Sequence, residues 1–387
     1  MTSLKSWGIL MSKWTTTKIS KLAKGYRGVS YKPHDLKLFP EDNDVVLLRS
    51  NNIADGKVNF DKIQIVPKRL AAPEQILQTH DVAICMANGS RLLVGKTAQF
   101  VGYEHSCVVG SFCSLYRSTN ISEQLLKYIF QSAAYKKAID ILLSGSAINN
   151  LNNNEINKIL IYHANCTREQ RKIAEVLSTV DEAIDKTYEI LDKHTKIKRG
   201  LMQDLLSQGV ETKLNQCLKV RHGKSQKKVE AVDGQYPILG TGGLMGMAKV
   251  FIYNKPSVLI GRKGTIDSPE YMETPFWTID TLYYTEMLNG NCAKYFYYIF
   301  QTIDWYKYNE ATGVPSLSCK GIGNITVKFI KDVAKQKEIV EKLTVADEHI
   351  QAERNYLAKL QAIKTGLMQD LLTNKVSVKA LLKEGVV

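Results

Sequence analysis

An internal repeat is the feature that most constrains how this chain can fold. The heptapeptide Gly-Leu-Met-Gln-Asp-Leu-Leu stands at 200–206 and again at 366–372. With the same offset of 166 residues, Glu-Gln-Arg-Lys-Ile at 169–173 matches Lys-Gln-Lys-Glu-Ile at 335–339. Self-similarity at a fixed offset marks a duplicated structural unit. The fold must therefore accommodate two copies of one segment in a single chain of 387 residues.

Both copies are predicted to be long helices. Their apolar residues recur at spacings of four, three, four and seven, which is a heptad pattern. A helix of about 40 residues is about 60 Å long, and its narrow apolar stripe needs a partner of similar length. We expect the two copies to pair with each other as an antiparallel intramolecular coiled coil, because a whole domain lies between them. Pairing between two molecules is the alternative, but it would make two copies in one chain redundant. The apolar positions are Ile173, Leu177, Val180, Ile184 and Leu191 in the first copy, and Ile339, Leu343, Ala346, Ile350 and Leu357 in the second.

The segments outside the two helices have the pattern of short strands separated by polar breaks. Apolar runs at 45–48, 81–85 and 257–260 are typical of buried strands. We predict an α+β fold, with two globular domains of mixed helix and strand separated by the two long antiparallel helices and related by a pseudo-two-fold axis. The expected boundaries are a first domain at 1–165, a first helix at 166–207, a second domain at 208–331, a second helix at 332–374 and a tail at 375–387.

Composition restricts the partners that such a chain can have. The formal net charge is +14 and the pI is about 9.2, which favours a polyanion such as nucleic acid, with an anionic membrane surface as second candidate. No apolar run approaches the roughly 18 residues of a membrane span. The seven cysteines form no Cys-x-x-Cys pair and no secretory leader opens the chain, so we expect reduced thiols, no metal site and a cytoplasmic protein.

At this point the sequence resembles the specificity subunits of type I restriction–modification enzymes. The resemblance covers nearly the whole chain, and the paired segments of the two helices are its most specific marks. These segments are 169–174 and 200–206, with their copies at 335–340 and 366–372. The target-recognition domains of the family are matched by 27–31, 48–53 and 95–96 in the first domain, and by 236–240, 260–265 and 275–281 in the second.

The resemblance implies a specific function in host defence. Each of two target-recognition domains would read one half of a bipartite double-stranded DNA site, and the helices would set the unread gap. Two modification subunits would dock on the chain and methylate adenine at N6 with S-adenosylmethionine, and motor-nuclease restriction subunits would join them. The resemblance also implies that repeated helix residues contact the modification subunits, namely Gln170, Ile173, Met202, Gln336, Ile339 and Met368. One departure is that Glu169 precedes Gln170, whereas Lys335 precedes Gln336.

Catalytic motifs are missing from the sequence. The segment 89–97 imitates a phosphate-binding loop, but five residues separate its glycines and no helical pattern follows Thr97. No Asn-Pro-Pro-aromatic motif is present to hold a flipped adenine, and Asp204 with 211–213 is an isolated imitation of a nuclease centre. We therefore expect a non-catalytic chain without a cofactor of its own.

Candidate DNA contacts lie in polar loops that follow strands. Arg or Lys suits guanine, Asn or Gln suits adenine, and small residues allow close approach. The candidates are Arg49, Asn51, Asn52 and Lys96 in the first domain, and Thr241, Gly242, Gly243, Arg262 and Lys263 in the second. A basic run of His222, Lys224, Lys227 and Lys228 is either a phosphate contact or a solvated linker.

Two other functions stay open at this stage. One is a basic coiled-coil scaffold that binds nucleic acid without sequence preference, and the other is a self-sufficient enzyme. Tyr295, Tyr297 and Tyr298 could stack on bases, but their helical spacing beside Phe296 and Phe300 favours core packing.

Overall fold

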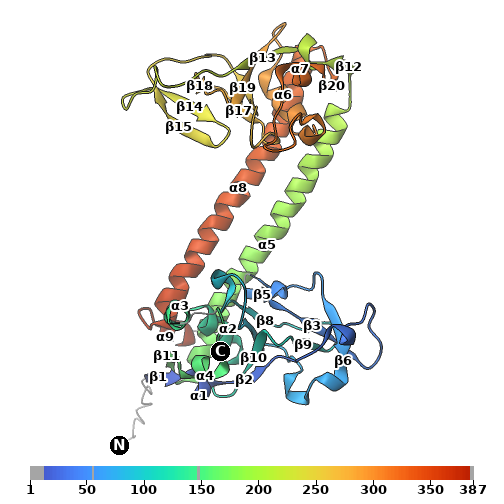
Figure 1. Ribbon diagram of the computed structural model, residues 1–387. Helices are drawn as coiled ribbons and strands as arrows, with labels where there is room; N and C mark the ends of the chain where they lie inside the picture. The colour runs from blue at the N-terminus through green and yellow to red at the C-terminus, as the bar shows by residue number, and fades with distance from the viewer. Residues whose placement is uncertain (1–12, 55, 146–148, 384–387) are drawn as a thin grey trace, which may run out of the picture. The chain divides into compact units, whose positions relative to one another are not determined.

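The computed structural model describes residues 13–54, 56–145 and 149–383 (Figure 1). The start of the predicted first domain and the end of the predicted tail therefore lie outside the described residues. By its internal contacts the chain divides into two compact units, a first unit of Met1–Lys186 with Leu357–Val387 and a second unit of Thr187–Tyr356. This division crosses both long helices, because each half of a helix packs with the globular part beside it.

The two long helices of the repeat are α5 (Thr167–Leu206) and α8 (Val333–Leu372). Neither contains proline, and both are rich in residues that favour helix. In the first unit Asp181 of α5 forms an ion pair with Lys364 of α8 at 2.7 Å, and in the second unit Lys198 pairs with Asp347 at 2.6 Å. Residue numbers rise along one helix as they fall along the other, which confirms the antiparallel intramolecular pairing.

The first unit contains three sheets. Its two-stranded antiparallel ribbon consists of β1 (Trp14–Lys18) and β11 (Leu160–Ala164), and it leads into α5, since β11 ends shortly before that helix begins. The six-stranded sheet follows the order β2 (Ala23–Arg27), β10 (Cys113–Ser118), β7 (Val82–Cys85), β8 (Thr97–Gln99), β5 (Gly56–Val58) and β4 (Ile53–Ala54). The three-stranded sheet is β6 (Gln64–Pro67), β3 (Asp44–Leu48) and β9 (Cys107–Val109). The shorter helices are α1 (Ile19–Leu22), α2 (Glu123–Gln131), α3 (Ala133–Ser144), α4 (Asn153–Lys158) and α9 (Lys379–Lys383).

The second unit repeats this plan with fewer strands in its main sheet. The four-stranded sheet is β13 (Leu218–His222), β19 (Leu282–Met287), β16 (Ser257–Gly261) and β17 (Glu270–Met272). The three-stranded sheet is β15 (Gly243–Ala248), β14 (Tyr236–Gly240) and β18 (Trp277–Thr278), and the ribbon is β12 (Val210–Lys213) and β20 (Thr326–Phe329). Its short helices are α6 (Ala293–Phe300) and α7 (Cys319–Asn324).

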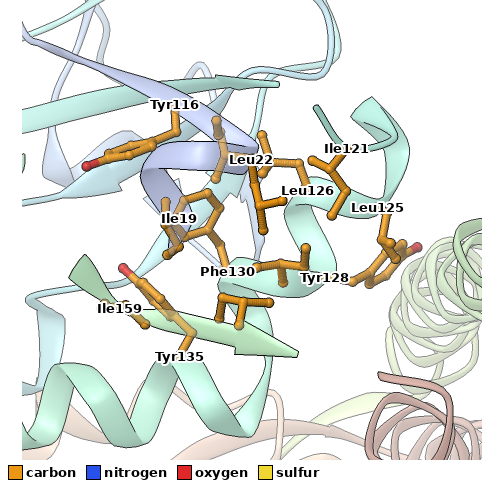
Figure 2. Close-up of a cluster of buried hydrophobic side chains, with 14 of the residues drawn as sticks. Ile19, Leu22, Tyr116, Ile121, Leu125, Leu126, Tyr128, Phe130, Tyr135 and Ile159 are labelled. Atoms are coloured by element: carbon orange, nitrogen blue, oxygen red, sulfur yellow. The ribbon is translucent and has the colours of Figure 1, made fainter. Parts of the chain in front are cut away.

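Each unit has a core that joins its globular part to the helix pair. In the first unit, Tyr116 of β10 lies at one side of a cluster of side chains from α1, α2 and α3, as Figure 2 shows. The same core includes Ile173 and Leu177 of α5 and Leu371 of α8. In the second unit Tyr295 and Tyr298 are fully buried in the corresponding core, which confirms that these tyrosines pack internally rather than stack on bases.

Candidate nucleic-acid interface

In the second unit, three loops meet at the end of β16. The backbone N–H of Arg262 donates to the carbonyl of Thr281 at 2.8 Å, and the N–H of Leu317 donates to the carbonyl of Arg262 at 3.0 Å. The N–H of Gly264 donates to the carbonyl of Pro315 at 2.9 Å. We call the segments 262–264, 279–281 and 314–317, together with the adjoining turn 241–243, the second loop cluster.

The turn at 241–243 belongs to this cluster by proximity. Gly240 and Gly243 pair across the hairpin of β14 and β15, and Gly243 has a φ of 95°, which favours glycine. A Cβ placed on Gly264 would lie 3.9 Å from Oγ1 of Thr241. The structure therefore brings Thr241, Gly242 and Gly243 beside the loop that carries Arg262 and Lys263.

The side chain of Arg262 is held in a defined orientation. Its Nη1 donates to the carbonyl of Asp280 at 3.0 Å, and its charge lies close to the Tyr283 hydroxyl. Burial, and after it the neighbouring Cys319, raise the pKa of Tyr283 to about 12, although Arg262 opposes the rise. Lys263 is exposed beside it. The hydrogen-bonded guanidinium of Arg262 and the exposed ammonium of Lys263 thus lie on the same turn.

His222 and the basic run after it adjoin this cluster. The His222 ring lies 5.0 Å from the Tyr283 ring, and its Nε2 lies 3.4 Å from Sγ of Cys319. Lys224 is exposed, while its backbone N–H donates to the carbonyl of Thr278 at 2.8 Å. Lys227 and Lys228 are exposed as well. The backbone of Lys224 is fixed by this hydrogen bond, while the three lysine side chains are accessible to solvent. Accessible lysines on a fixed backbone suit contacts with phosphates.

The first unit has the same arrangement of loops. The N–H of Met86 donates to the carbonyl of Phe112 at 2.8 Å, and the N–H of Leu151 donates to the carbonyl of Met86 at 2.8 Å. Met86 therefore occupies the position of Arg262, and Phe112 that of Thr281. A Cβ on Gly28 would lie 2.0 Å from the carbonyl oxygen of Gly110, and a Cβ on Gly223 would lie 1.9 Å from that of Ile279. We call 49–52, 86–90, 110–112 and 149–151 the first loop cluster.

Arg49, Asn51 and Asn52 lie in this cluster, but their side chains differ in exposure to solvent. The prediction that Asn52 contacts DNA is corrected, because its side chain is fully buried. Its Oδ1 accepts from the N–H of Arg49 at 2.9 Å, and its Nδ2 donates to the carbonyls of Asn59 at 3.1 Å and Asp61 at 2.9 Å. Asn52 thus shapes the loop that presents Arg49 and the exposed Asn51.

Lys96 lies at the base of the same cluster. Burial raises the pKa of the Cys85 thiol, and the charge of Lys96 opposes the rise, so the two side chains are close. Cys85 directly precedes Met86, and Thr97 begins β8 rather than a helix. The segment 89–97 is therefore not a phosphate-binding loop, and Lys96 is half-buried beside the first loop cluster.

The sequence analysis missed three residues of the first loop cluster. Asn88 donates from Nδ2 to Oγ of Ser50 at 3.3 Å, and Asn149 donates from Nδ2 to the carbonyl of Gly89 at 3.2 Å. Phe112 is 69% exposed on the turn after β9. By the matched backbone hydrogen bonds, Asn88 corresponds to position 264, Asn149 to 315 and Phe112 to 281. The sequence does not show this, because the loops of the two units share no motif.

The repeated helix residues turn out to be internal. Gln170 accepts at Oε1 from the N–H of Ser122 at 2.8 Å and donates from Nε2 to the carbonyl of Ala164 at 2.7 Å. Gln336 accepts from the N–H of Cys292 at 2.8 Å and donates to the carbonyl of Ile330 at 2.8 Å. Both side chains are buried. These glutamines lock each helix onto the globular part of its own unit.

The other residues assigned to partner contacts are also covered by the chain itself. Ile173 and Ile339 are 1% exposed, Met202 is 9% exposed, and Met368 packs against the core of the first unit. The prediction of contact with a modification subunit is corrected for the five buried side chains, Gln170, Ile173, Met202, Gln336 and Ile339, since a buried side chain cannot reach another chain in this arrangement. Met368 is half-buried, and its contact stays a prediction. Glu169 and Lys335 differ in their surroundings, because Glu169 is buried and accepts from Nε1 of Trp14 at 3.3 Å, whereas Lys335 is exposed.

A second repeated contact joins helix and globular part in each unit. In the first unit the carboxylate of Asp181 accepts from the Tyr128 hydroxyl at 2.8 Å and from Lys127 at 2.9 Å, besides its ion pair with Lys364. In the second unit Asp347 accepts from the Tyr298 hydroxyl at 2.8 Å, besides its ion pair with Lys198. We call these the first and second carboxylate clamps.

The described residues offer neither a metal site nor a membrane span. They contain no group of three or more His, Cys, Asp or Glu side chains arranged to hold a metal ion. In the part of the chain that the structure describes, no helix combines the length and the apolar character needed to cross a membrane.

Fold and loops together define a duplicated α+β protein on an antiparallel helix pair. Residues 209–362 match the family model described as the type I restriction modification DNA specificity domain. The specificity subunit of the type I restriction enzyme StySPI from Salmonella potsdam is 31% identical over 217 residues, 56% of this chain and 46% of that protein. The EcoKI specificity subunit of Escherichia coli (strain K12) is 30% identical over 213 residues, 54% of this chain and 45% of that protein.

A solved structure extends the likeness to the whole fold. The S subunit of a type I restriction–modification system from M. genitalium superposes with a TM-score of 0.63 at 16% identity, covering 94% of this chain and 96% of that one. The matched region spans about half the length of the two curated relatives. The chain is therefore similar to type I restriction–modification specificity subunits, in sequence over residues 209–362 and in fold over most of its length.

Proposed function

We propose that the chain supplies DNA sequence specificity to a type I restriction–modification complex. Each loop cluster reads one half of a bipartite DNA site. The observation that carries this proposal is that two equivalent backbone arrangements present different side chains. At one matched acceptor position the first unit presents Phe112, which is 69% exposed, and the second unit presents the half-buried Thr281. One framework that offers two unlike surfaces suits the reading of two unlike half-sites.

The chemistry of the second loop cluster suits guanine. Arg262 uses one nitrogen for the carbonyl of Asp280, so other guanidinium donors stay free for the O6 and N7 acceptors of guanine. Thr241 and Gly242 allow a base edge to approach closely. Lys224, Lys227 and Lys228 would neutralise phosphates, in line with the net charge of +14.

The first loop cluster carries amide side chains and one arginine where the second loop cluster carries Arg262 and Lys263. Arg49 is half-buried, and Asn51 is exposed next to it. Amide side chains pair with the N6 and N7 edge of adenine. Lys96 adds positive charge at the base of the cluster. This composition supports a first half-site with different bases from the second.

We propose further that the helices set the gap between the half-sites and support the partners. Two modification subunits would methylate adenine at N6 with S-adenosylmethionine that they bind themselves, and motor-nuclease subunits would add restriction. The sequence has no Asn-Pro-Pro-aromatic motif for a flipped adenine, which supports a non-catalytic role for this chain. Because five of the six repeated helix residues are buried, the exposed faces of α5 and α8 are the surfaces to test for partner contacts.

Selection of bound sequences from random duplex DNA tests this function. The full chain is used alone and with its modification subunits. We expect an enriched motif with two separate halves, and methylation only when the modification subunits are present. A nucleic-acid scaffold without sequence preference would enrich no motif, and a self-sufficient enzyme would methylate alone. Either result would contradict the proposal.

A further inference from the structure

Phe112 stands on a tight turn of the first loop cluster with its ring exposed to solvent. The turn runs from Gly110 to Cys113, whose N–H donates to the carbonyl of Gly110 at 2.8 Å. The carbonyl of Phe112 accepts from the N–H groups of Met86 at 2.8 Å and Ala87 at 3.2 Å. Although the backbone is held in this way, the side chain is 69% exposed. A large apolar ring is thus presented to solvent by a fixed backbone.

The second unit builds the same turn without an aromatic residue. The N–H of Leu282 closes it by donating to the carbonyl of Ile279 at 3.1 Å. Thr281 takes the position of Phe112, accepts at its carbonyl from the N–H of Lys263 at 3.4 Å and is half-buried. Single exposed apolar side chains are common on protein surfaces and often have no role. Because the turn also forms with threonine, however, folding does not require the exposed ring of Phe112.

Ala87 connects this turn to Asn150 on its other side. Ala87 and Asn150 form an antiparallel bridge, and the side chain of Asn150 is exposed. Phe112, Ala87 and Asn150 are therefore neighbours across the backbone, and we call them the first reading row. The corresponding row of the second unit consists of Thr281, Lys263 and Ser316. An apolar ring and an amide on either side of a small residue thus replace two hydroxyl groups on either side of a cation.

The side chains of the first reading row match the major-groove edge of an A·T base pair. Adenine presents there the N7 acceptor and the N6 donor, and thymine presents its O4 acceptor and its C5-methyl group. The amide of Asn150 suits the adenine edge, and the ring of Phe112 suits the methyl group. Adjacent paired strands lie about 4.8 Å apart, so the outer positions of the row are about 10 Å apart. This separation fits the major groove, which is about 12 Å wide.

We propose that Phe112 is a specificity residue that contacts the C5-methyl group of a thymine in the first half-site. The amide of Asn150 contacts the adjacent adenine edge. The ring removes the methyl group from water, so the contact is lost when uracil, which lacks the methyl group, replaces thymine. This inference rests on the proposed DNA-reading function and names a base pair that the first loop cluster recognises.

Thymine and uracil form a matched pair of probes, because they differ only in the C5-methyl group. The full chain with its modification subunits first selects its motif from random duplex DNA. Each thymine of the two half-sites is then replaced singly by deoxyuridine, and the affinity of each duplex is measured by competition. At one thymine of the first half-site, the uracil duplex is expected to bind about fourfold more weakly, since the burial of one methyl group is lost.

Substitutions of exposed phenylalanines assign this difference to Phe112. Phe112→Ser should weaken binding of the thymine duplex about fourfold or more and make the thymine and uracil duplexes bind equally. Phe112→Leu keeps an apolar side chain and should retain part of the difference. Phe39→Ser is the matched control, because Phe39 is 78% exposed in the same unit but lies outside both loop clusters. It should leave the difference between the two duplexes unchanged.

The outcomes separate this inference from the proposed function. Failure to select a bipartite motif would contradict both. A bipartite motif whose first half-site contains no thymine, or tolerates uracil at every thymine, would overturn the role of Phe112 alone. The inference would equally be overturned if Phe112→Ser weakened the thymine and uracil duplexes by the same factor, because the ring would then not read the methyl group. Since Phe112 is exposed, Phe112→Ser is expected to stay folded, which thermal unfolding checks.

Discussion

The two units share a framework and differ in what they place on it. The hydrogen bond from Leu151 to Met86 at 2.8 Å has its counterpart from Leu317 to Arg262 at 3.0 Å. Yet Met86 is buried in the core of the first unit, whereas Arg262 stands at the second loop cluster with its guanidinium bonded to a backbone carbonyl. Contacts between helix and globular part are repeated, while the loop side chains are not. The comparison separates residues that build the fold from residues that are free to differ between the half-sites.

The largest contrast is expected at the position shared by Met86 and Arg262. Met86→Ala should cost about 2–4 kcal/mol of folding free energy, because it leaves a space in a core. Arg262→Ala should leave stability within about 0.5 kcal/mol and cost about 1–3 kcal/mol of DNA binding if it reads a guanine. Denaturant unfolding and binding to selected DNA measure the two effects.

The pattern of DNA loss decides what Arg262 does. A base contact predicts loss confined to changes in one half-site. A uniform loss across sequences would demote Arg262 to a phosphate contact. A large loss of stability would instead place it among the structural residues.

Replacing the buried glutamines should give the next largest loss of stability, and the loss should be similar in the two units. Gln336→Ala removes bonds to Cys292, Asn291 and Ile330, and Gln170→Ala removes bonds to Ser122 and Ala164. Unpaired buried groups remain in both cases, so losses of about 3 and about 2 kcal/mol are expected. The free energy of unfolding measures them.

Exposed Gln369 on α8 provides the control for the glutamine pair. Gln369→Ala should change stability by less than about 0.5 kcal/mol. If Gln170→Ala were equally mild and instead prevented assembly with the modification subunits, the internal role assigned to Gln170 would be refuted.

The first carboxylate clamp should lose its contribution to stability in acid. Burial is the largest influence on Asp181 and raises its pKa, but the hydrogen bonds and charges of Lys364 and Lys127 together lower the pKa below its usual value. A lowered folded-state pKa contributes stability above the unfolded value of about 3.9, and this stability is lost as the pH falls through the lower folded value.

Asp181→Asn should therefore cost about 1–2 kcal/mol near neutral pH and progressively less below about pH 4. Denaturant unfolding of the parent chain and of the variant, repeated at several values from pH 6 to pH 3, measures this stability cost. Asp347→Asn is the matched variant in the second unit, where one lysine instead of two contacts the carboxylate. Asp347→Asn is therefore expected to cost less stability than Asp181→Asn. If Asp181→Asn cost the same stability at every pH, the ion-pair explanation would be contradicted.

The smallest effects are expected from the basic run of the second unit. Replacing Lys224, Lys227 or Lys228 by Gln should weaken DNA binding equally for all sequences. Each replacement should reduce the slope of log affinity against log salt by about 0.9 if the lysine contacts a phosphate. Salt titrations of single variants measure this slope. An unchanged slope would mean that these lysines are solvated.

The sequence predicted the parts of the fold that repeat. Periodicity alone located both helices, because the apolar stripe of α5 recurs residue for residue in α8. Burial could not be predicted in the same way. Asn52 looks like an adenine-reading amide, but tertiary contacts with Asn59 and Asp61 enclose it. The same holds for Gln170, whose partner Ser122 lies 48 residues away.

The loop clusters were predicted only in part, because distant segments assemble them. Arg262 and Thr241 were identified from glycine-bounded turns, and the structure brings both turns together. Asn88 and Phe112 carry no local signal, and they join the first loop cluster through backbone bonds to segments far away in sequence.

The most direct test of the account is to lengthen both helices and read the recognised sequence. Seven residues are inserted into α5 near Lys186 and seven into α8 near Tyr356, and the methylated sites are sequenced in cells that also carry the modification subunits. A heptad adds about 10.5 Å of helix, or about three base pairs. The account predicts two unchanged half-sites with a gap about three base pairs longer. Altered half-sites, or an unchanged gap, would contradict it.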